Sequence, residues 1–193
     1  VRGAGGVLVA KNRDNPPAFE PLQTLIRQRG TAAAGGATLA IGTFGSAPAA
    51  SSGINAAGLC MVDTAVRTTD LGLGVLRYYL MEALLIRCAD VPAALAMIRT
   101  MPHLGGGNLV LGDGAGQIAA VEIGQSRVAV SDDAGRGWVA RTNHFLDPAL
   151  ARGLVNPPGS EPRRDSESRL AFLEARLSQG VAGFTEDDCA ALL

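Results

Sequence analysis

Short apolar runs separated by turn residues fill the first third of the chain and predict β-strands. Runs of about four to eight apolar residues between glycine and proline clusters are typical of strands. The runs are Gly6–Ala10, Leu22–Arg27 and Thr38–Phe44, and Ser51–Val66 adds a turn and then a strand at Leu59–Val62, with Gly53 and Gly58 bracketing a tight connection.

Two helices are predicted next. Leu76–Arg87 places its apolar residues at helical spacing, and its length favours a helix over a strand. Asp90 precedes Pro92 by two positions, which is typical of an N-cap residue before a helix over Ala93–Met101.

Hairpins and a helical end complete the pattern. Hairpin strands are predicted at Asn108–Leu111 with Ile118–Ile123, and at Arg127–Ser131 with Trp138–Arg141. After a proline-rich and glycine-rich loop, Asp165 or Ser166 is expected to cap a helix that ends near Leu177, and Thr185 begins a last helix with an approximate capping box. Runs of strands alternating with runs of helices predict an α+β fold, and we expect residues 1–193 to form a single domain.

Composition and charge narrow the class of protein. Hydrophobic residues make up 47% and charged residues 18% of the 193 residues, which indicates a globular chain. The formal net charge of −1 gives no electrostatic reason to expect a nucleic acid or an anionic membrane as a partner. No apolar run reaches the roughly 18–20 residues that span a bilayer, and no signal-peptide pattern is recognisable, which favours a cytoplasmic location.

Cysteine and histidine usage excludes the commonest sites built on these residues. The three cysteines, Cys60, Cys88 and Cys189, are odd in number and share no CxxC spacing, so neither a disulfide framework nor a zinc site is expected. The two histidines, His103 and His144, lie far apart, and nothing in the sequence supports a Ser-His-Asp triad.

Several fragments, in order along the chain, resemble the acyl-CoA:6-aminopenicillanate acyltransferase family, which is related to penicillin V acylases and bile-salt hydrolases. They are the segments VAKNRD (9–14), GINAAGL (53–59), NLVLGDGAGQIAAVE (108–122) and RTNHF (141–145), followed by Ser168-Arg169 in a helix. The resemblance covers about the whole chain. It implies a four-layer αββα sandwich of two antiparallel sheets, the fold of the N-terminal-nucleophile (Ntn) hydrolases.

The resemblance also implies a mechanism. In this family the nucleophile is a cysteine that autoproteolysis frees at a new N-terminus, and its α-amino group acts as the base. An α-amine has an unperturbed pKa of roughly 7.7–8.0, so it can replace histidine at working pH. Such an enzyme hydrolyses a linear N-acyl amide, or transfers an acyl group from a thioester to an amine, through an acyl-enzyme. It needs no metal or organic cofactor.

Six residues receive roles by this resemblance. Asp14 would orient the nucleophile or its amino group, Asn143 would donate to the oxyanion, and Arg169 would bind Asp14 or a substrate carboxylate. Thr64 is near the position where relatives often carry an asparagine, so it is included as a catalytic residue and the second oxyanion donor stays open. Lys11 and Ser168 are expected at the substrate. Each residue also has an ordinary structural explanation, as a turn, cap or solvated helix residue.

Val1 has no nucleophilic side chain, and the family places its cysteine slightly further ahead of the matching aspartate than Val1 is ahead of Asp14. We therefore expect the nucleophile a few residues upstream of Val1. Two alternatives remain: a catalytically inactive member that acts as a binding or assembly subunit, and a mistaken family match. A plain α/β hydrolase is disfavoured because no GxSxG is present. A propeptide-derived second chain and a homo-oligomer are both compatible with the resemblance.

Overall fold

A computed structural model describes residues 1–14, 16–30, 34–45 and 51–193 of the chain. Its centre is a seven-stranded antiparallel sheet in which sequence neighbours lie side by side, in the order β3-β4-β5-β6-β7-β8-β9. The strands are β3 (Gln23–Gln28), β4 (Thr38–Thr43), β5 (Ser52–Asn55), β6 (Cys60–Ala65), β7 (Gly107–Gly112), β8 (Ile118–Ile123) and β9 (Val128–Asp132). The remaining strands, β1 (Arg2–Gly3) and β2 (Gly6–Val7), form a separate hairpin.

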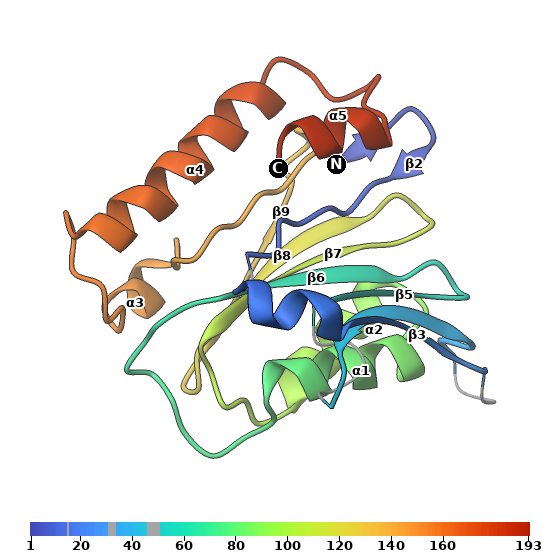
Figure 1. Ribbon diagram of the computed structural model, residues 1–193, viewed down its shortest axis with the longest axis horizontal. Helices are drawn as coiled ribbons and strands as arrows, with labels where there is room; N and C mark the ends of the chain where they lie inside the picture. Colours follow the sequence, from blue (N-terminus) through green and yellow to red (C-terminus); the bar gives the residue numbers. More distant parts are fainter. Residues whose placement is uncertain (15, 31–33, 46–50) are drawn as a thin grey trace.

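Helices α1 (Arg77–Arg87) and α2 (Val91–Thr100) connect β6 to β7 and cover one face of the sheet, which we call the helix face (Figure 1). Met61, Leu109 and Val121 project from this face and join leucines of α1 and Ile98 of α2 in the main hydrophobic core. Asp90 caps α2 by accepting a hydrogen bond from the Ala93 N–H at 2.8 Å. This part of the fold agrees with the sequence prediction.

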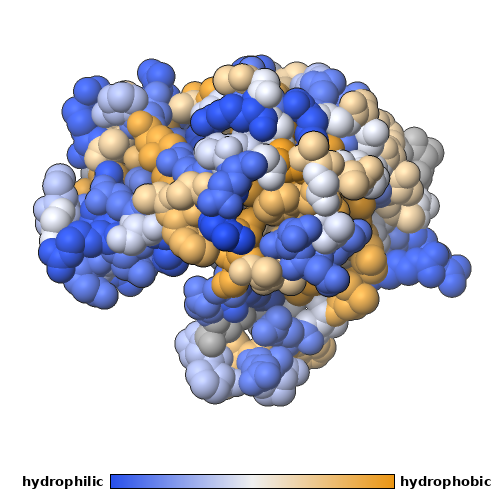
Figure 2. All heavy atoms as spheres, turned by 90° about the horizontal axis from the view of Figure 1, so that it is seen from above, coloured by the Kyte–Doolittle hydropathy of each residue, from blue (hydrophilic) through white to orange (hydrophobic). Residues whose placement is uncertain are grey.

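The opposite face, which we call the cavity face, is covered by a different layer. The β1–β2 hairpin, α4 (Glu161–Leu177) and α5 (Glu186–Ala191) lie above the sheet, and both ends of the chain lie in this layer (Figure 1). The short helices η1 (Pro17–Leu22) and α3 (Pro148–Ala151) lie in connections. Alternation of side chains along β3, β4 and β5 leaves Leu25, Leu39, Ile41 and Ile54 exposed on the cavity face. Hydrophobic atoms are visible among hydrophilic ones from this side (Figure 2).

Several sequence predictions need correction. Trp138–Arg141 does not pair as a strand, because the turn after β9 leads the chain into the upper layer, where Trp138 packs against Leu177 and Val181. Only Gly6 and Val7 of the predicted first strand are in a strand, and Gly53 lies within β5 rather than in a turn. Helix α4 begins at Glu161 with Ser160 as its N-cap, because Pro162 is well tolerated in a first helical turn. Thr185 does form a capping box with Asp188.

The α+β class is confirmed, with one large antiparallel sheet. The expected second sheet of a four-layer sandwich is not present in the described part of the chain, where the upper layer contains the two short strands β1 and β2. None of the helices that the structure describes is long and apolar enough to cross a membrane.

Candidate active site

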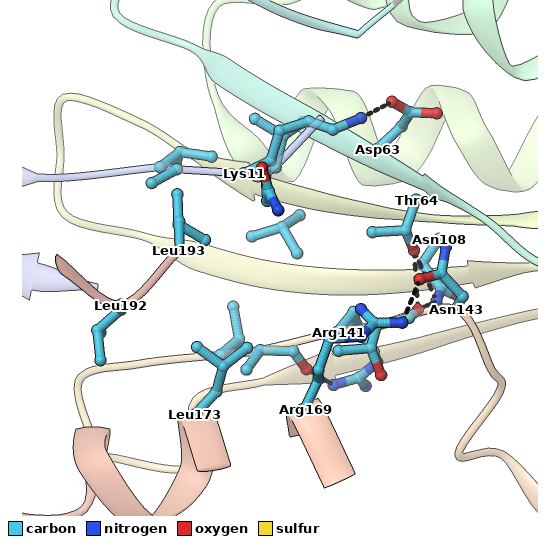
Figure 3. Close-up of a pocket in the computed structure, with 18 of the residues that line it drawn as sticks. Lys11, Asp63, Thr64, Asn108, Arg141, Asn143, Arg169, Leu173, Leu192 and Leu193 are labelled. Atoms are coloured by element: carbon cyan, nitrogen blue, oxygen red, sulfur yellow. Dashed lines mark hydrogen bonds and ion pairs between the residues drawn. The ribbon is translucent and has the colours of Figure 1, made fainter. Parts of the chain in front are cut away.

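A cavity of about 720 Å³ lies between the cavity face of the sheet and the upper layer (Figure 3). Its walls come from residues 8–14, from β6 and β7, from residues 139–143, from α4 and from the C-terminal residues. All six residues that the sequence resemblance singled out line this one cavity: Lys11, Asp14, Thr64, Asn143, Ser168 and Arg169. Four separate segments of the chain, residues 8–14, β6, residues 139–143 and α4, therefore bring the predicted residues together.

Lys11 is held by a buried carboxylate. Its Nζ lies 2.8 Å from Oδ1 of Asp63, while the Nε of Arg77 lies 2.6 Å from Oδ2 of the same residue. Asp63 pairs with Leu109 of β7, but the pairing of β6 with β5 ends at Ser52 opposite Val62, so Lys11 meets Asp63 just beyond the β5 side of the ladder. Asp63 is 3% exposed, and two cations on one buried carboxylate leave this end of the cavity with a net positive charge.

Asn143 is exposed to the cavity with its amide orientation fixed. Its Oδ1 accepts a hydrogen bond from Nη2 of Arg169 at 3.1 Å, and its Nδ2 donates to the carbonyl oxygen of Ala65 at 2.9 Å. Arginine can only donate hydrogen bonds, so the contact with Arg169 keeps the oxygen of the amide on that side. One of the two Nδ2 protons is used by Ala65, and the other remains available to a ligand.

Arg169 does not pair with Asp14, which was one of the two partners expected from the sequence. Its Nε and Nη2 donate to Oδ2 of Asp165, one turn earlier in α4, at 3.0 and 2.8 Å. Asp14 instead accepts a hydrogen bond on Oδ1 from Nδ2 of Asn12 at 2.9 Å, and its carboxylate is exposed at the cavity. Ser168 is exposed on the same helix as Arg169. The predicted carboxylate and the predicted arginine thus line the same cavity with separate partners.

The hydroxyl of Thr64 is committed to the protein backbone. It donates to the carbonyl oxygen of Thr142 at 2.9 Å and accepts from Nδ2 of Asn108 at 3.2 Å. In this arrangement the Thr64 proton points to the loop that carries Asn143 rather than to a ligand.

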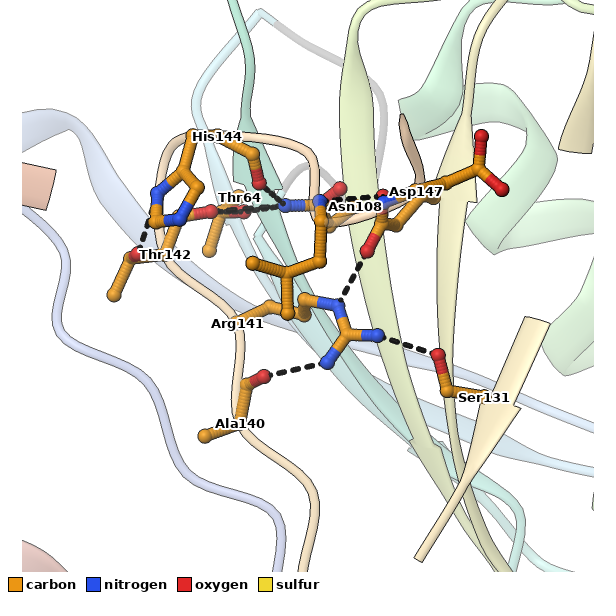
Figure 4. A network of polar contacts seen from close by, with 10 residues as sticks. Thr64, Asn108, Ser131, Ala140, Arg141, Thr142, His144 and Asp147 are labelled. Carbon is orange, nitrogen blue, oxygen red and sulfur yellow. Dashed lines mark hydrogen bonds and ion pairs between the residues drawn. The ribbon is translucent and has the colours of Figure 1, made fainter. Parts of the chain in front are cut away.

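A largely buried polar network forms part of the cavity wall and extends behind it, and the sequence reasoning missed it (Figure 4). Arg141 donates from Nε to Oε1 of Glu122 at 2.9 Å and from Nη2 to Oγ of Ser131 at 2.6 Å. The other oxygen of Glu122 accepts from the backbone N–H groups of Leu146 and Asp147 at 2.8 and 2.9 Å. The signal available in the sequence was a charged residue inside an otherwise apolar strand, IAAVEI (118–123).

His144 belongs to this buried region. Its Nδ1 lies 2.8 Å from Oγ of Ser166 and 3.2 Å from Oγ1 of Thr142. Burial lowers the pKa of His144, and the positive charge of Arg163 acts in the same direction. The imidazole is therefore neutral at pH 7 and ties α4 to the loop that carries Asn143.

The three cysteines of the chain do not have the features of activated thiols. Burial raises the pKa of Cys60, Cys88 and Cys189, whereas a reactive cysteine has a lowered pKa. Cys189 lines the cavity, and Cys60 donates a weak hydrogen bond to the carbonyl oxygen of Gly112 at 3.3 Å. Among the described residues no group of three or more His, Cys, Asp or Glu side chains has the geometry to hold a metal ion.

Comparison with known proteins identifies a family that the chain matches over most of its length. Residues 1–185 match the protein family described as acyl-coenzyme A:6-aminopenicillanic acid acyl-transferase. No curated protein matches the sequence.

Solved structures show a similar fold. A variant of conjugated bile acid hydrolase from Clostridium perfringens superposes with a TM-score of 0.53 at 17% identity, covering 81% of this chain and 62% of that one. A second variant of the same enzyme gives 0.52 at 15% identity, covering 81% and 63%. Penicillin V acylase from Agrobacterium tumefaciens gives 0.49 at 16% identity, covering 79% and 46%. The chain thus spans less than two thirds of the length of these enzymes.

Proposed function

Because this chain belongs to the acyl-coenzyme A:6-aminopenicillanic acid acyl-transferase family, we propose that it is an Ntn-type enzyme that hydrolyses or transfers the acyl group of a linear N-acyl amide. The observation that carries the proposal is the single cavity lined by all six residues that the family resemblance selects. Hydrolysis is the simpler assignment, because water competes for any acyl-enzyme. The substrate is a small N-acyl amide or acyl thioester, and we assign no metal or organic cofactor to the reaction.

We assign the attacking thiol to a cysteine upstream of Val1, released by autoproteolysis. The backbone supports this position. Val1 and Leu8 exchange two hydrogen bonds, N–H to carbonyl at 2.8 and 2.9 Å, so they pair as antiparallel neighbours. Polypeptide that continues this pairing before Val1 runs beside residues 9–14, which line the cavity. A few residues of strand therefore suffice to bring a cysteine beside Lys11 and Asp14.

The remaining groups then take complementary roles. The free α-amine of the cysteine removes the thiol proton, and the positive charge at Lys11 and Arg77 favours the thiolate. The thiolate attacks the acyl carbonyl, and the second Nδ2 proton of Asn143 stabilises the oxyanion. The amine leaves with a proton from the enzyme, and water or an acceptor amine then attacks the thioester. Asp14 holds the α-ammonium, and Ser168 contacts the substrate.

We further propose that the upper layer is part of a second sheet, so that the chain forms one four-layer domain. The backbone N–H of Arg2 donates to the carbonyl of Gly137 at 2.7 Å, which places β1 beside an extended segment under α4 and α5. Strand added before Val1 would widen this layer. A propeptide-derived chain that stays bound after autoproteolysis is the partner that this assignment favours.

The decisive experiment is the intact mass and N-terminal sequence of the protein purified from its native source, combined with alkylation by iodoacetamide. We expect an N-terminal cysteine a few residues before Val1 and loss of activity on its alkylation. The same preparation is tested on a panel of acyl amides, with and without amine acceptors, to separate hydrolysis from transfer. A native terminus at Val1, without turnover of the panel, would support an inactive binding subunit and overturn the proposal.

A further inference from the structure

Three polar residues form a row across the middle of the cavity face. The strand register places Thr64 of β6 directly opposite Asn108 of β7, and Asn108 directly opposite Glu122 of β8. Directly paired residues share a face, so the three side chains project side by side towards the upper layer. Asn108 is 0% and Glu122 2% exposed, although the same face of β7 and β8 is otherwise built from Val110, Ile118 and Ala120.

The row contacts one loop, residues 141–147, which carries Asn143. Nδ2 of Asn108 lies 2.8 Å from the carbonyl oxygen of Thr142 and 3.2 Å from that of His144, the two carbonyls that flank Asn143. Thr64 donates to the first of these carbonyls as well. Glu122 binds the two ends of the loop, through the guanidinium of Arg141 and the N–H groups of Leu146 and Asp147.

Chemistry fixes the direction of each contact. Backbone carbonyls only accept hydrogen bonds, so the amide of Asn108 must turn its NH₂ towards the loop. Its Oδ1 is then buried without a partner. A buried polar atom without a hydrogen bond destabilises the fold. The orientation of Asn108 thus carries a cost in stability at Oδ1, while its NH₂ contacts both carbonyls around Asn143.

We propose that Asn108 and Glu122 are positioning residues that fix the loop so that Asn143 presents its free N–H to the cavity. Asn108 belongs to the cavity wall, but it is 0% exposed and Glu122 is 2% exposed, so neither side chain has to touch the substrate. The expected effect on catalysis rests on the proposed function. The orientation of Asn143 can be measured without any reaction.

The chain supplies a matched control in Asn55 of β5. This residue is also buried, at 5% exposure, and its Nδ2 donates to two backbone carbonyls, those of Leu85 and Cys88, both at 2.8 Å. Asn55 does not line the cavity. Its Oδ1 also accepts from the N–H groups of Ala57 and Leu59. Asn55→Ser therefore removes a buried asparagine with at least as many hydrogen bonds as Asn108, away from Asn143.

The first measurement is NMR of the 193-residue chain labelled with ¹⁵N at its six asparagines, with the Asn143 side-chain pair assigned through its absence in Asn143→Ala. We expect Asn108→Ser to shift or broaden the Asn143 pair and Asn55→Ser to leave it in place. If Asn108→Ser does not fold, Glu122→Gln replaces it. The single amide oxygen of glutamine can accept from the N–H groups of Leu146 and Asp147, whereas the contact with Arg141 is lost. An unchanged Asn143 pair in a folded variant of the row overturns the proposal.

The second measurement is steady-state kinetics of the full-length protein on an acyl amide that it cleaves. We expect Asn108→Ser to lower kcat by about 10- to 100-fold with KM unchanged, since a misplaced oxyanion donor affects only the transition state. Asn55→Ser should leave both constants unchanged in the folded fraction. A KM increase at constant kcat in Asn108→Ser contradicts the inference. If even the unmodified protein cleaves no acyl amide, the proposed function fails, and the NMR result still decides the role of Asn108.

Discussion

On the helix face of β6, β7 and β8, Met61, Leu109 and Val121 pack against α1 and α2, whereas on the cavity face of the same strands Thr64, Asn108 and Glu122 hold a loop by hydrogen bonds. The first set gains stability from burial in proportion to apolar area, without directional requirements. The second set must satisfy each donor and acceptor individually. One sheet thus separates a face that stabilises the fold from a face that orients a site, and this division can be tested.

The largest expected effect is at the residue that serves both faces. Asp63 binds Arg77 at the start of α1 and Lys11 in the cavity. Asp63→Asn leaves the buried guanidinium of Arg77 without a counter-charge, and we expect a loss of about 3–5 kcal/mol in the free energy of unfolding. Urea denaturation measures it. Lys11→Met, which removes only the cavity-side partner, is the control and should cost much less. Equal losses would show that the contact with Arg77 is not the dominant one.

On the cavity face, Asn143→Ala should act on catalysis rather than on stability. Removal of one oxyanion donor lowers kcat by roughly 10²–10³, or about 2.7–4 kcal/mol. The side chain is exposed, so the urea midpoint should change little. Asn156→Ala, outside the cavity, is the control for kinetics. An unchanged kcat in Asn143→Ala would show that Asn143 is not an oxyanion donor, and it would weaken the distinction between the two faces.

On the helix face, Ile98→Val should have the opposite profile. Ile98 is 0% exposed in the core, and loss of one buried methylene costs about 0.5–1.5 kcal/mol of stability. Because this residue does not line the cavity, kcat and KM of the folded protein should stay at their starting values. A change of kcat or KM in fully folded Ile98→Val would mean that the two faces are coupled through the strands.

The smallest effect is expected from pH, on the cavity face. Because burial lowers the pKa of His144 below the unfolded value of about 6.5, the unfolded chain binds the proton more readily. Stability should therefore be complete above pH 6.5 and decrease as the pH falls from there towards the folded pKa. Thermal unfolding between pH 7.5 and 5.5 measures this slope. His144→Gln should flatten it, and an identical slope in the variant would assign the effect to other groups.

Local patterns predicted most of the sheet and both helices of the helix face, because period-two strands and the Asp90 cap are encoded within a few residues. They failed at Trp138–Arg141, where an apolar pattern reflects burial in the upper layer without strand pairing. Helix α4 begins earlier than expected because Ser160 and Pro162 were assigned to a loop.

For the site, the ordered family motifs selected six residues that line one cavity, although their roles stay predictions. Asp63, Asn108 and Glu122 were not found as site residues, because their importance depends on which strands pair and in which register. Strand order and register cannot be read from a local stretch of sequence. Arg169 was expected to bind Asp14 or a substrate carboxylate. It does not contact Asp14, because the helical turn places Asp165 beside it, and its role towards a substrate stays a prediction.

The insertion of α1 and α2 between β6 and β7 has a consequence for folding kinetics. Adjacent strands of a meander form early, because each closes a short loop, but β6 and β7 meet only across the connection from Val66 to Gly106. Thr64 and Asn108 are paired at this long-range junction. We therefore expect the two parts of the sheet, β3–β6 and β7–β9, to form before they pair with each other. The loop around Asn143 is supported only after that pairing, so the cavity is among the last features to be assembled.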